Sequence, residues 1–133
     1  MAEEVRVAVH SDVDIVVARQ TGRKMAARLG FSPTDMTMIA TAISELARNI
    51  VLYARKGEII FTEAVDHERS GIVVVARDEG PGIQDVKQAL LSGFSTSGSL
   101  GLGLPGVRRL MDEIQIDSQL KVGTVVTVKK WVQ

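Results

Sequence analysis

The chain has 133 residues, of which 45% are hydrophobic and 24% are charged, and this balance predicts a packed globular fold rather than a disordered chain. Sixteen Lys and Arg balance sixteen Asp and Glu, so no long-range field favours nucleic acid or an anionic membrane as a partner. The absence of cysteine excludes a disulfide framework, a thiol nucleophile and a Cys-based zinc site.

The length suits one domain and is too short for two comfortable ones, so we expect residues 1–133 to form a single domain. The first ten residues lack a basic segment followed by an apolar core, and no apolar run approaches the length of a membrane span. These patterns predict a cytoplasmic protein with no membrane partner.

The first half of the chain predicts one strand and two helices. Valines alternate with other residues over 5–9, which is typical of a half-buried strand, and we place this strand at a sheet edge. Apolar residues then recur at helical spacing over 12–29, before Gly30. A second helix is expected from Ser32-Pro33 to about Ala54.

The second half predicts four more strands. Two β-branched runs, 57–65 and 71–78, suggest an antiparallel hairpin with its turn at Ser70-Gly71. Residues 113–120 and 123–132 suggest two further strands. Short helices are expected over 84–91 and from Pro105.

The order of these elements predicts the fold class. One strand, two helices, two strands, loops with short helices and two strands indicate a two-layer α/β (α+β) sandwich. We expect a mixed sheet of about five strands with the helices on one face.

A carboxylate and an amide lie one turn apart on the second predicted helix. Glu45 and Asn49 share a face that is separate from the apolar stripe of that helix. Oxygen ligands suit Mg²⁺, and a carboxylate beside the metal can accept a proton. The alternative interpretation is an ordinary exposed polar face of an amphipathic helix.

An acid followed by glycines ends the strand 71–78. Asp78 is positioned to accept a hydrogen bond from an exocyclic amine, while Gly80 and Gly82 let a flat ring lie against backbone. The alternative is a tight turn in which Asp78 caps its own backbone.

Glycines are also concentrated in the run Phe94–Gly106, just before a predicted helix. Free N–H groups at a helix start, with the positive end of the helix dipole, suit a phosphate. A mobile loop is the alternative for this run.

Together, these motifs resemble a known family. ELARN (45–49), DEGPG (78–82), GLGLPG (101–106) and the late Gly123-Thr124 resemble, in this order and spacing, the GHKL ATP-binding superfamily of gyrase, heat-shock chaperones, histidine kinases and MutL. The resemblance spans essentially the whole chain, and implies a Bergerat-type ATP-binding fold. A domain of this size is most similar to the small serine-kinase branch, the stressosome switch kinases.

The resemblance implies a role for each motif. Asn49 would ligate Mg²⁺, Glu45 would take the proton from the attacking serine hydroxyl, and Asp78 would bind the adenine amino group. Phe94–Ser99 would form a short lid over the nucleotide. The remaining residues implied to contact ATP are Gly80, Gly82, Ser95, Thr96, Ser97, Gly98, Gly101, Leu102, Gly103, Leu104 and Thr124.

The resemblance also implies the function: transfer of the γ-phosphoryl group of ATP to a serine of a STAS-domain antagonist, followed by release to activate a PP2C-type phosphatase in a stress-signalling partner switch. One departure is that no Lys or Arg lies between Gly93 and Val107, where related kinases often offer a cation to the terminal phosphate. A nucleotide-gated binding module with little turnover is therefore kept as the alternative.

Overall fold

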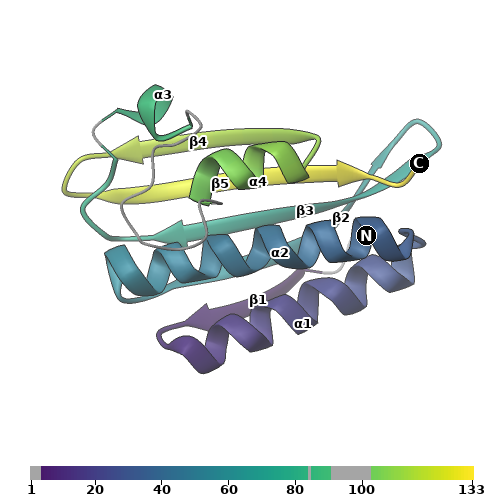
Figure 1. The fold of residues 1–133 in the computed structure, drawn as a ribbon, viewed down its shortest axis with the longest axis horizontal. Coiled ribbons are helices and arrows are strands. Elements are labelled where there is room, and N and C mark those ends of the chain that lie inside the picture. Colours follow the sequence, from purple (N-terminus) through teal and green to yellow (C-terminus); the bar gives the residue numbers. More distant parts are fainter. Residues whose placement is uncertain (1–3, 84, 91–102) are drawn as a thin grey trace.

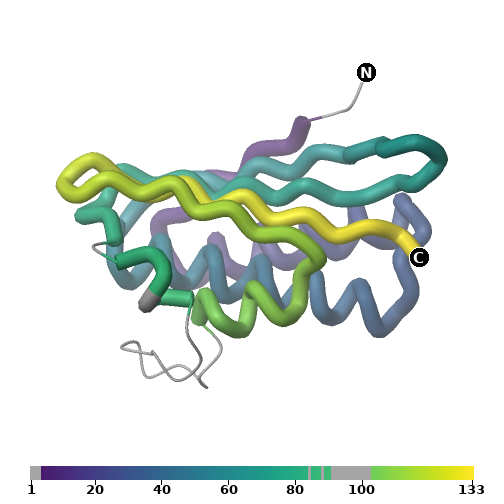
Figure 2. The backbone as a smooth tube through the Cα atoms, turned by 90° about the horizontal axis from the view of Figure 1, so that it is seen from above, coloured from purple at the N-terminus to yellow at the C-terminus, as the bar shows by residue number. Residues whose placement is uncertain are grey.

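The computed structural model describes residues 4–83, 85–90 and 103–133 and arranges them in two layers. A five-stranded sheet forms one layer, and the helices cover one of its faces (Figure 1), as the view from above also shows (Figure 2). The helices are α1 (Asp12–Leu29), α2 (Pro33–Asn49), α3 (Val86–Ala89) and α4 (Gly103–Leu110). The predicted two-layer α+β fold is confirmed.

The sheet has the strand order β1-β2-β3-β5-β4, so β1 lies at an edge, as predicted. Its strands are β1 (Glu4–Val9), β2 (Gly57–Asp66), β3 (Arg69–Asp78), β4 (Glu113–Gln119) and β5 (Gly123–Trp131). All four neighbouring pairs are antiparallel, so the expectation of a mixed sheet was wrong. For β1 and β2 the reason is that two helices connect them. The chain runs back along α1 and forward again along α2, so it enters β2 in the direction opposite to that of β1.

Local signals at the helix ends explain where α1 and α2 begin. The side chain of Asp14 accepts hydrogen bonds from the backbone N–H groups of His10 (2.8 Å) and Ser11 (3.2 Å) before α1. Ser32 accepts from Asp35 N at 3.1 Å before α2, whose first residue is Pro33. These contacts satisfy N–H groups that have no partner within the helix.

The core lies between the sheet and the helices. The inner positions of β2, β3 and β5 alternate with outer ones, and they pack against the apolar stripe of α2. The largest side chains that are less than 2% exposed include Phe61, Ile39, Ile43, Ile59 and Ile72. This core holds α2 against the middle of the sheet, and with it the residues Glu45 and Asn49.

The sequence predicted a single helix to about Ala54, but the helical geometry changes after Asn49. Residues Ile50–Ala54 are helical, as expected, but they form a π-helical turn in which Arg55 N donates to Ile50 O at 2.8 Å. Arg55 then has φ +72°, which stops the helix before β2. The π-turn places Tyr53 at the pocket described below.

Two smaller expectations were also wrong. The turn between β2 and β3 is at His67-Glu68 rather than Ser70-Gly71, and His67 has φ +57°. Gly71 lies within β3, where a Cβ would come within 2.6 Å of the Trp131 ring. Close packing against Trp131, rather than turn formation, therefore explains this glycine. The helix expected over 84–91 is shorter, since α3 comprises Val86–Ala89 within the described part of the chain.

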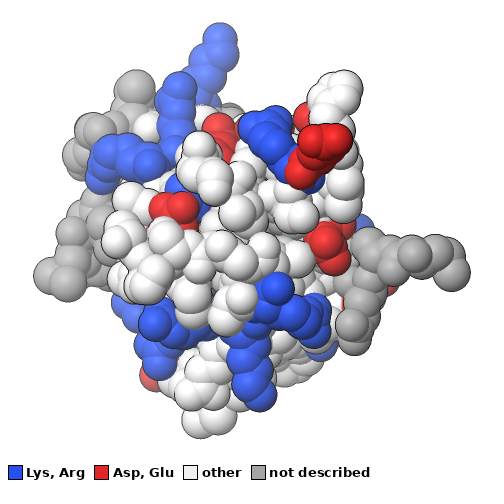
Figure 3. Space-filling model, turned by 90° about the vertical axis from the view of Figure 1, so that its right-hand side faces the viewer, with Lys and Arg blue, Asp and Glu red and all other residues white. Residues whose placement is uncertain are grey.

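The end of the molecule with the β2–β3 turn shows Lys and Arg interspersed with Asp and Glu on a largely uncharged surface (Figure 3). No helix among the described residues is long and apolar enough to cross a membrane.

Candidate active site

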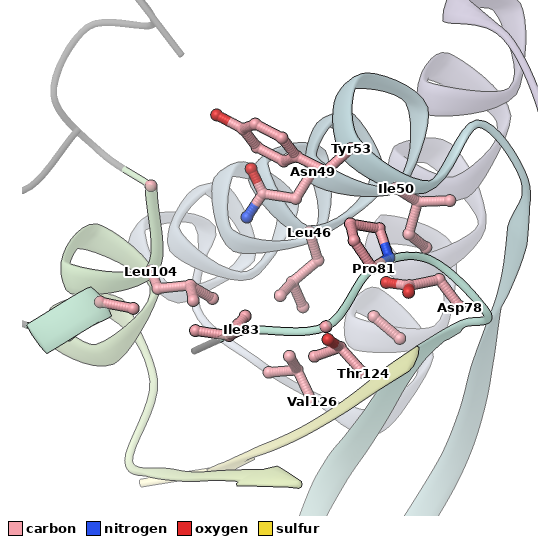
Figure 4. A pocket seen from close by; sticks show the side chains of 14 residues that line it. Leu46, Asn49, Ile50, Tyr53, Asp78, Pro81, Ile83, Leu104, Thr124 and Val126 are labelled. Carbon is pink, nitrogen blue, oxygen red and sulfur yellow. The ribbon is translucent and has the colours of Figure 1, made fainter. Parts of the chain in front are cut away.

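A pocket opens at the end of the sheet where β3 ends and β5 begins, between α2 and α4 (Figure 4). Six of the residues predicted from the sequence line it, although they come from five separate segments of the chain. They are Asn49, Asp78, Gly82, Gly103, Leu104 and Thr124. The fold therefore brings residues of all four sequence motifs to one place.

Asp78 is the last residue of β3, and its carboxylate lies at one end of the pocket, opposite Leu104 (Figure 4). Its Oδ1 accepts a hydrogen bond from Gly80 N at 2.9 Å, which is the local turn considered as the alternative above. Within the described residues Oδ2 has no donor. The turn and a ligand contact are therefore compatible, because each uses a different oxygen.

Gly82 holds the following loop against the turn between β4 and β5. It has φ +81°, and a Cβ built on it would lie 2.5 Å from the backbone oxygen of Gln119. Pro81 O accepts from Lys121 N at 2.8 Å beside it. The backbone of the loop thus lies directly on the hairpin, which leaves no room for a side chain at position 82.

We expect Gly82→Ala to lower the free energy of unfolding by ~2–4 kcal/mol, because it combines an unfavourable φ with overpacking against backbone. Urea denaturation measures this. Gly30→Ala is the matched control, since Gly30 has φ +94° but nothing within 4 Å of its would-be Cβ. Equal losses in the two variants would mean that the contact with Gln119 has no energetic consequence.

Three polar side chains form one row across the inner face of the sheet. Thr124 of β5 is paired directly with Asp78 of β3 on one side and with Ser118 of β4 on the other. The next row inward, Ala76, Val126 and Ile116, is entirely apolar. The polar row is therefore the part of the sheet that meets the pocket. Ser118 was missed from the sequence, although it breaks an inward-facing series of isoleucines in β4.

Glu45 lies beneath the first turn of α4. It is only 5% exposed, and its Oε2 accepts a hydrogen bond from Gly103 N at 3.2 Å. A carboxylate at a helix N-terminus is stabilised by the N–H groups and the dipole there. The alternative interpretation of an ordinary exposed polar face is therefore wrong for Glu45, which is buried beneath α4 and contacts one of the residues that line the pocket.

Asn49 lines the same pocket one turn further along α2, and Tyr53 follows it on the π-turn (Figure 4). Sequence reasoning missed Tyr53, because the π-turn that places it cannot be recognised from helical periodicity. It also missed the apolar walls, Leu46, Ile50, Ile83 and Val126, which look like ordinary core positions in the sequence.

Several predicted contacts cannot be compared with the structure. Ser95, Thr96, Ser97, Gly98, Gly101 and Leu102 lie outside the described residues. Gly80 is described but does not line the pocket; a Cβ there would meet Ala54 of the π-turn at 2.7 Å. Its role in the structure is to let the loop pass close to the end of the helix.

The pocket combines apolar walls with polar groups at its two ends. At one end lies Asp78 Oδ2, which has no donor in the described part of the chain, and an amide and the N-terminus of α4 lie toward the other end. Such a pocket suits a flat ring with an exocyclic donor and an anionic tail. Among the described residues no cluster of three or more His, Cys, Asp or Glu is arranged to hold a metal ion.

Comparison with known proteins identifies relatives over most of the chain. A model of the histidine kinase-like ATPase domain matches residues 8–130. The chain is 48% identical over 133 residues, all of both chains, to the serine/threonine-protein kinase RsbT of Bacillus subtilis (strain 168). It is 30% identical over 119 residues to the anti-sigma F factor of Halalkalibacterium halodurans, covering 85% of this chain and 81% of that protein.

A solved structure agrees with the fold. The crystal structure of the RsbU and RsbW domains of Rv1364c from Mycobacterium tuberculosis superposes with a TM-score of 0.64 and 19% sequence identity. The match covers 98% of this chain and 32% of that one.

Proposed function

Because the chain belongs to the histidine kinase-like ATPase domain family, we propose that residues 1–133 form a single ATP-binding domain that phosphorylates a serine of a partner protein. The whole-length identity to a serine/threonine-protein kinase supports this activity. The observation that carries the proposal is the pocket itself, which combines the Asp78 carboxylate, Asn49 and the start of α4 in one cavity.

The donor set of the pocket fits an adenine nucleotide. Asp78 Oδ2 is available to accept from the adenine amino group, and Ile83 and Val126 offer apolar surface to the ring. Gly103 and Leu104 begin α4; Gly103 N donates to Glu45, so the N–H group of Leu104 is the one that suits a phosphate oxygen, with Gly103 contacting the ligand through its Cα. Thr124, which is paired with Asp78, lies at the end of the pocket proposed to hold the adenine ring. The residues 95–98, 101 and 102 that the family resemblance adds belong to the same proposed phosphate site.

Asn49 is the proposed protein ligand of Mg²⁺, since its amide oxygen is a hard donor at the pocket wall. The metal would neutralise charge on the phosphates, which is the main requirement of phosphoryl transfer. This contribution matters here because residues 94–106 contain no Lys or Arg. Glu45 is the proposed base, taking the proton of the attacking serine hydroxyl.

The relatives suggest the setting of this reaction. RsbT and the anti-sigma F factors support interactions with other regulators in a partner switch. We propose a STAS-domain protein as the phosphorylated partner and a PP2C-type phosphatase as the protein activated after release.

The test is to incubate the purified protein with γ-labelled ATP and a purified STAS-domain protein, with Mg²⁺ or with excess EDTA. We expect labelled phosphoserine on the STAS protein only when Mg²⁺ is present. Release of free phosphate without labelled protein would instead mean an ATPase, and labelling that persists in EDTA would contradict the metal site.

A nucleotide-gated binding module is the second candidate, and the lack of a cation in residues 94–106 favours it. Under this function the same incubation gives ATP-dependent binding to the STAS protein without phosphoserine.

A further inference from the structure

Lys130 is a buried cation that has no part in the proposed reaction. The inner face of β5 is polar only at its two ends, where Thr124 lines the pocket and Lys130 lies at the opposite end, with Val126 and Val128 between them. Lys130 is only 8% exposed. A lysine is almost never buried to this extent unless it is paired, because removing its charge from water is costly. The contacts of Lys130 therefore have to account for its position.

These contacts join Lys130 to the end of α4. Its Nζ donates a hydrogen bond to Leu110 O at 2.8 Å, and Leu110 is the last residue of that helix. Asp112 Oδ1 lies 3.8 Å from Nζ, which is close enough for an ion pair but too far for a hydrogen bond. A cation at a helix C-terminus satisfies a carbonyl group that has no partner within the helix, and it interacts favourably with the helix dipole. Lys130 thus anchors the C-terminus of α4.

The other end of α4 is held by the opposite charge. Gly103 N, at the first residue, donates to the buried carboxylate of Glu45 at 3.2 Å. The helix therefore lies between an acid at its positive end and a cation at its negative end. Among the described residues Thr124 is the only other buried polar side chain, so two of the three such side chains hold this one helix of eight residues.

The placement of α4 matters because its start belongs to the proposed phosphate site. Gly103 and Leu104 line the pocket, and the N–H group of Leu104 is the one proposed to meet a phosphate oxygen. A helix of this length is only about 12 Å long, so a shift at Leu110 is transmitted to Leu104. Stability alone does not explain Lys130, because well-packed apolar residues in place of a buried ion pair often leave stability unchanged or higher.

We propose that Lys130 is a positioning residue: by holding the C-terminus of α4, it keeps the N–H group of Leu104 aligned with the phosphates of the nucleotide. This inference rests on the proposed ATP site. Lys130 does not touch the nucleotide and acts only through α4. The proposed adenine end of the pocket is formed by β3, β5 and the loop after β3, so it does not depend on this helix. Loss of Lys130 should therefore weaken the binding of the phosphates and leave the binding of adenosine unchanged.

The test compares Lys130→Met, which keeps a long side chain but removes the cationic donor, with Lys130→Arg, which retains a cationic donor. Dissociation constants for ATP with Mg²⁺ and for adenosine are measured by calorimetry. We expect the preference of Lys130→Met for ATP over adenosine to fall about tenfold, the value of one hydrogen bond to a charged group. Lys130→Arg should retain most of the wild-type preference.

Lys129→Met is the matched control for the loss of one positive charge. Lys129 is the preceding residue of β5, so its side chain lies on the opposite face of the sheet. This variant should keep the wild-type preference. If Lys130→Met weakens ATP and adenosine equally, or weakens neither, Lys130 is only a structural cap and the inference is overturned. A wild-type protein that binds adenosine as tightly as ATP would instead contradict the proposed phosphate site.

A second measurement uses the wild-type protein and so does not depend on the folding of a variant. Coupling between two sites is reciprocal, so phosphates bound at the start of α4 should also stabilise its end. Met111 N donates to Val107 O at 3.1 Å just after the last turn of the helix. We expect ATP to slow hydrogen exchange of the Met111 amide, measured by NMR, and adenosine to leave it unchanged. Equal slowing by the two ligands would overturn the inference.

Discussion

Asp78→Asn should raise the dissociation constant for ATP by at least about 100-fold, which corresponds to roughly 3 kcal/mol for a hydrogen bond to a charged group. Asp78 needs two acceptors, one for Gly80 N at 2.9 Å and one for the ligand. Asparagine has only one acceptor oxygen, so either orientation of its amide places an NH₂ group against a donor. Calorimetric titration with ATP measures the effect.

Asp66→Asn is the matched control for the loss of one negative charge. Asp66 ends β2 at the opposite end of the hairpin, and among the described residues its side chain makes exposed contacts with Arg69 at 3.5 Å and His67 at 3.6 Å. We expect it to bind ATP like the wild type. If Asp78→Asn also binds ATP normally and remains folded, Asp78 does not bind the adenine amino group and the proposed adenine site is wrong.

Glu45→Gln should lower the rate of phosphoryl transfer by about 10²–10⁴-fold, the usual contribution of a general base. ATP affinity should change little, because the amide oxygen of glutamine can still accept from Gly103 N, as Glu45 does at 3.2 Å. The measurements are the single-turnover rate of serine labelling and the dissociation constant of ATP.

Glu45→Ala separates the two roles that the structure gives this side chain. It removes the base and also the acceptor under α4, so any loss of ATP affinity beyond that of Glu45→Gln reports the contact with Gly103. Glu63→Gln, at an exposed position of β2, is the control for lost charge. A Glu45→Gln variant that transfers phosphate at the wild-type rate would exclude Glu45 as the base.

Several features could be predicted from the sequence because they depend on neighbours in the chain. Ser32-Pro33 marks the start of α2, Gly30 the end of α1, and the alternation of valines marks β1. The fold class followed from the order of these elements. The spacing of Glu45, Asn49, Asp78 and the late Gly-Thr pair led to the family, which the comparisons confirm.

Other features depend on contacts between residues far apart in the chain, and the sequence did not reveal them. The direction of β2 depends on how two helices pack against the sheet, and the turn at His67-Glu68 depends on pairing between β2 and β3. Gly71 resembled a turn glycine. In the structure a side chain at this position would collide with the ring of Trp131, which is 60 positions further along the chain.

The sequence alone determined the local elements, the family and the residue types available for an ATP site, because periodicity, caps and motifs are properties of short segments. Only the tertiary structure decided which polar groups meet. Strand register aligned Ser118, Thr124 and Asp78 in one row, and the packing of α4 on α2 brought Gly103 to Glu45. Register and helix packing are set by long-range burial of the core, which no short segment encodes.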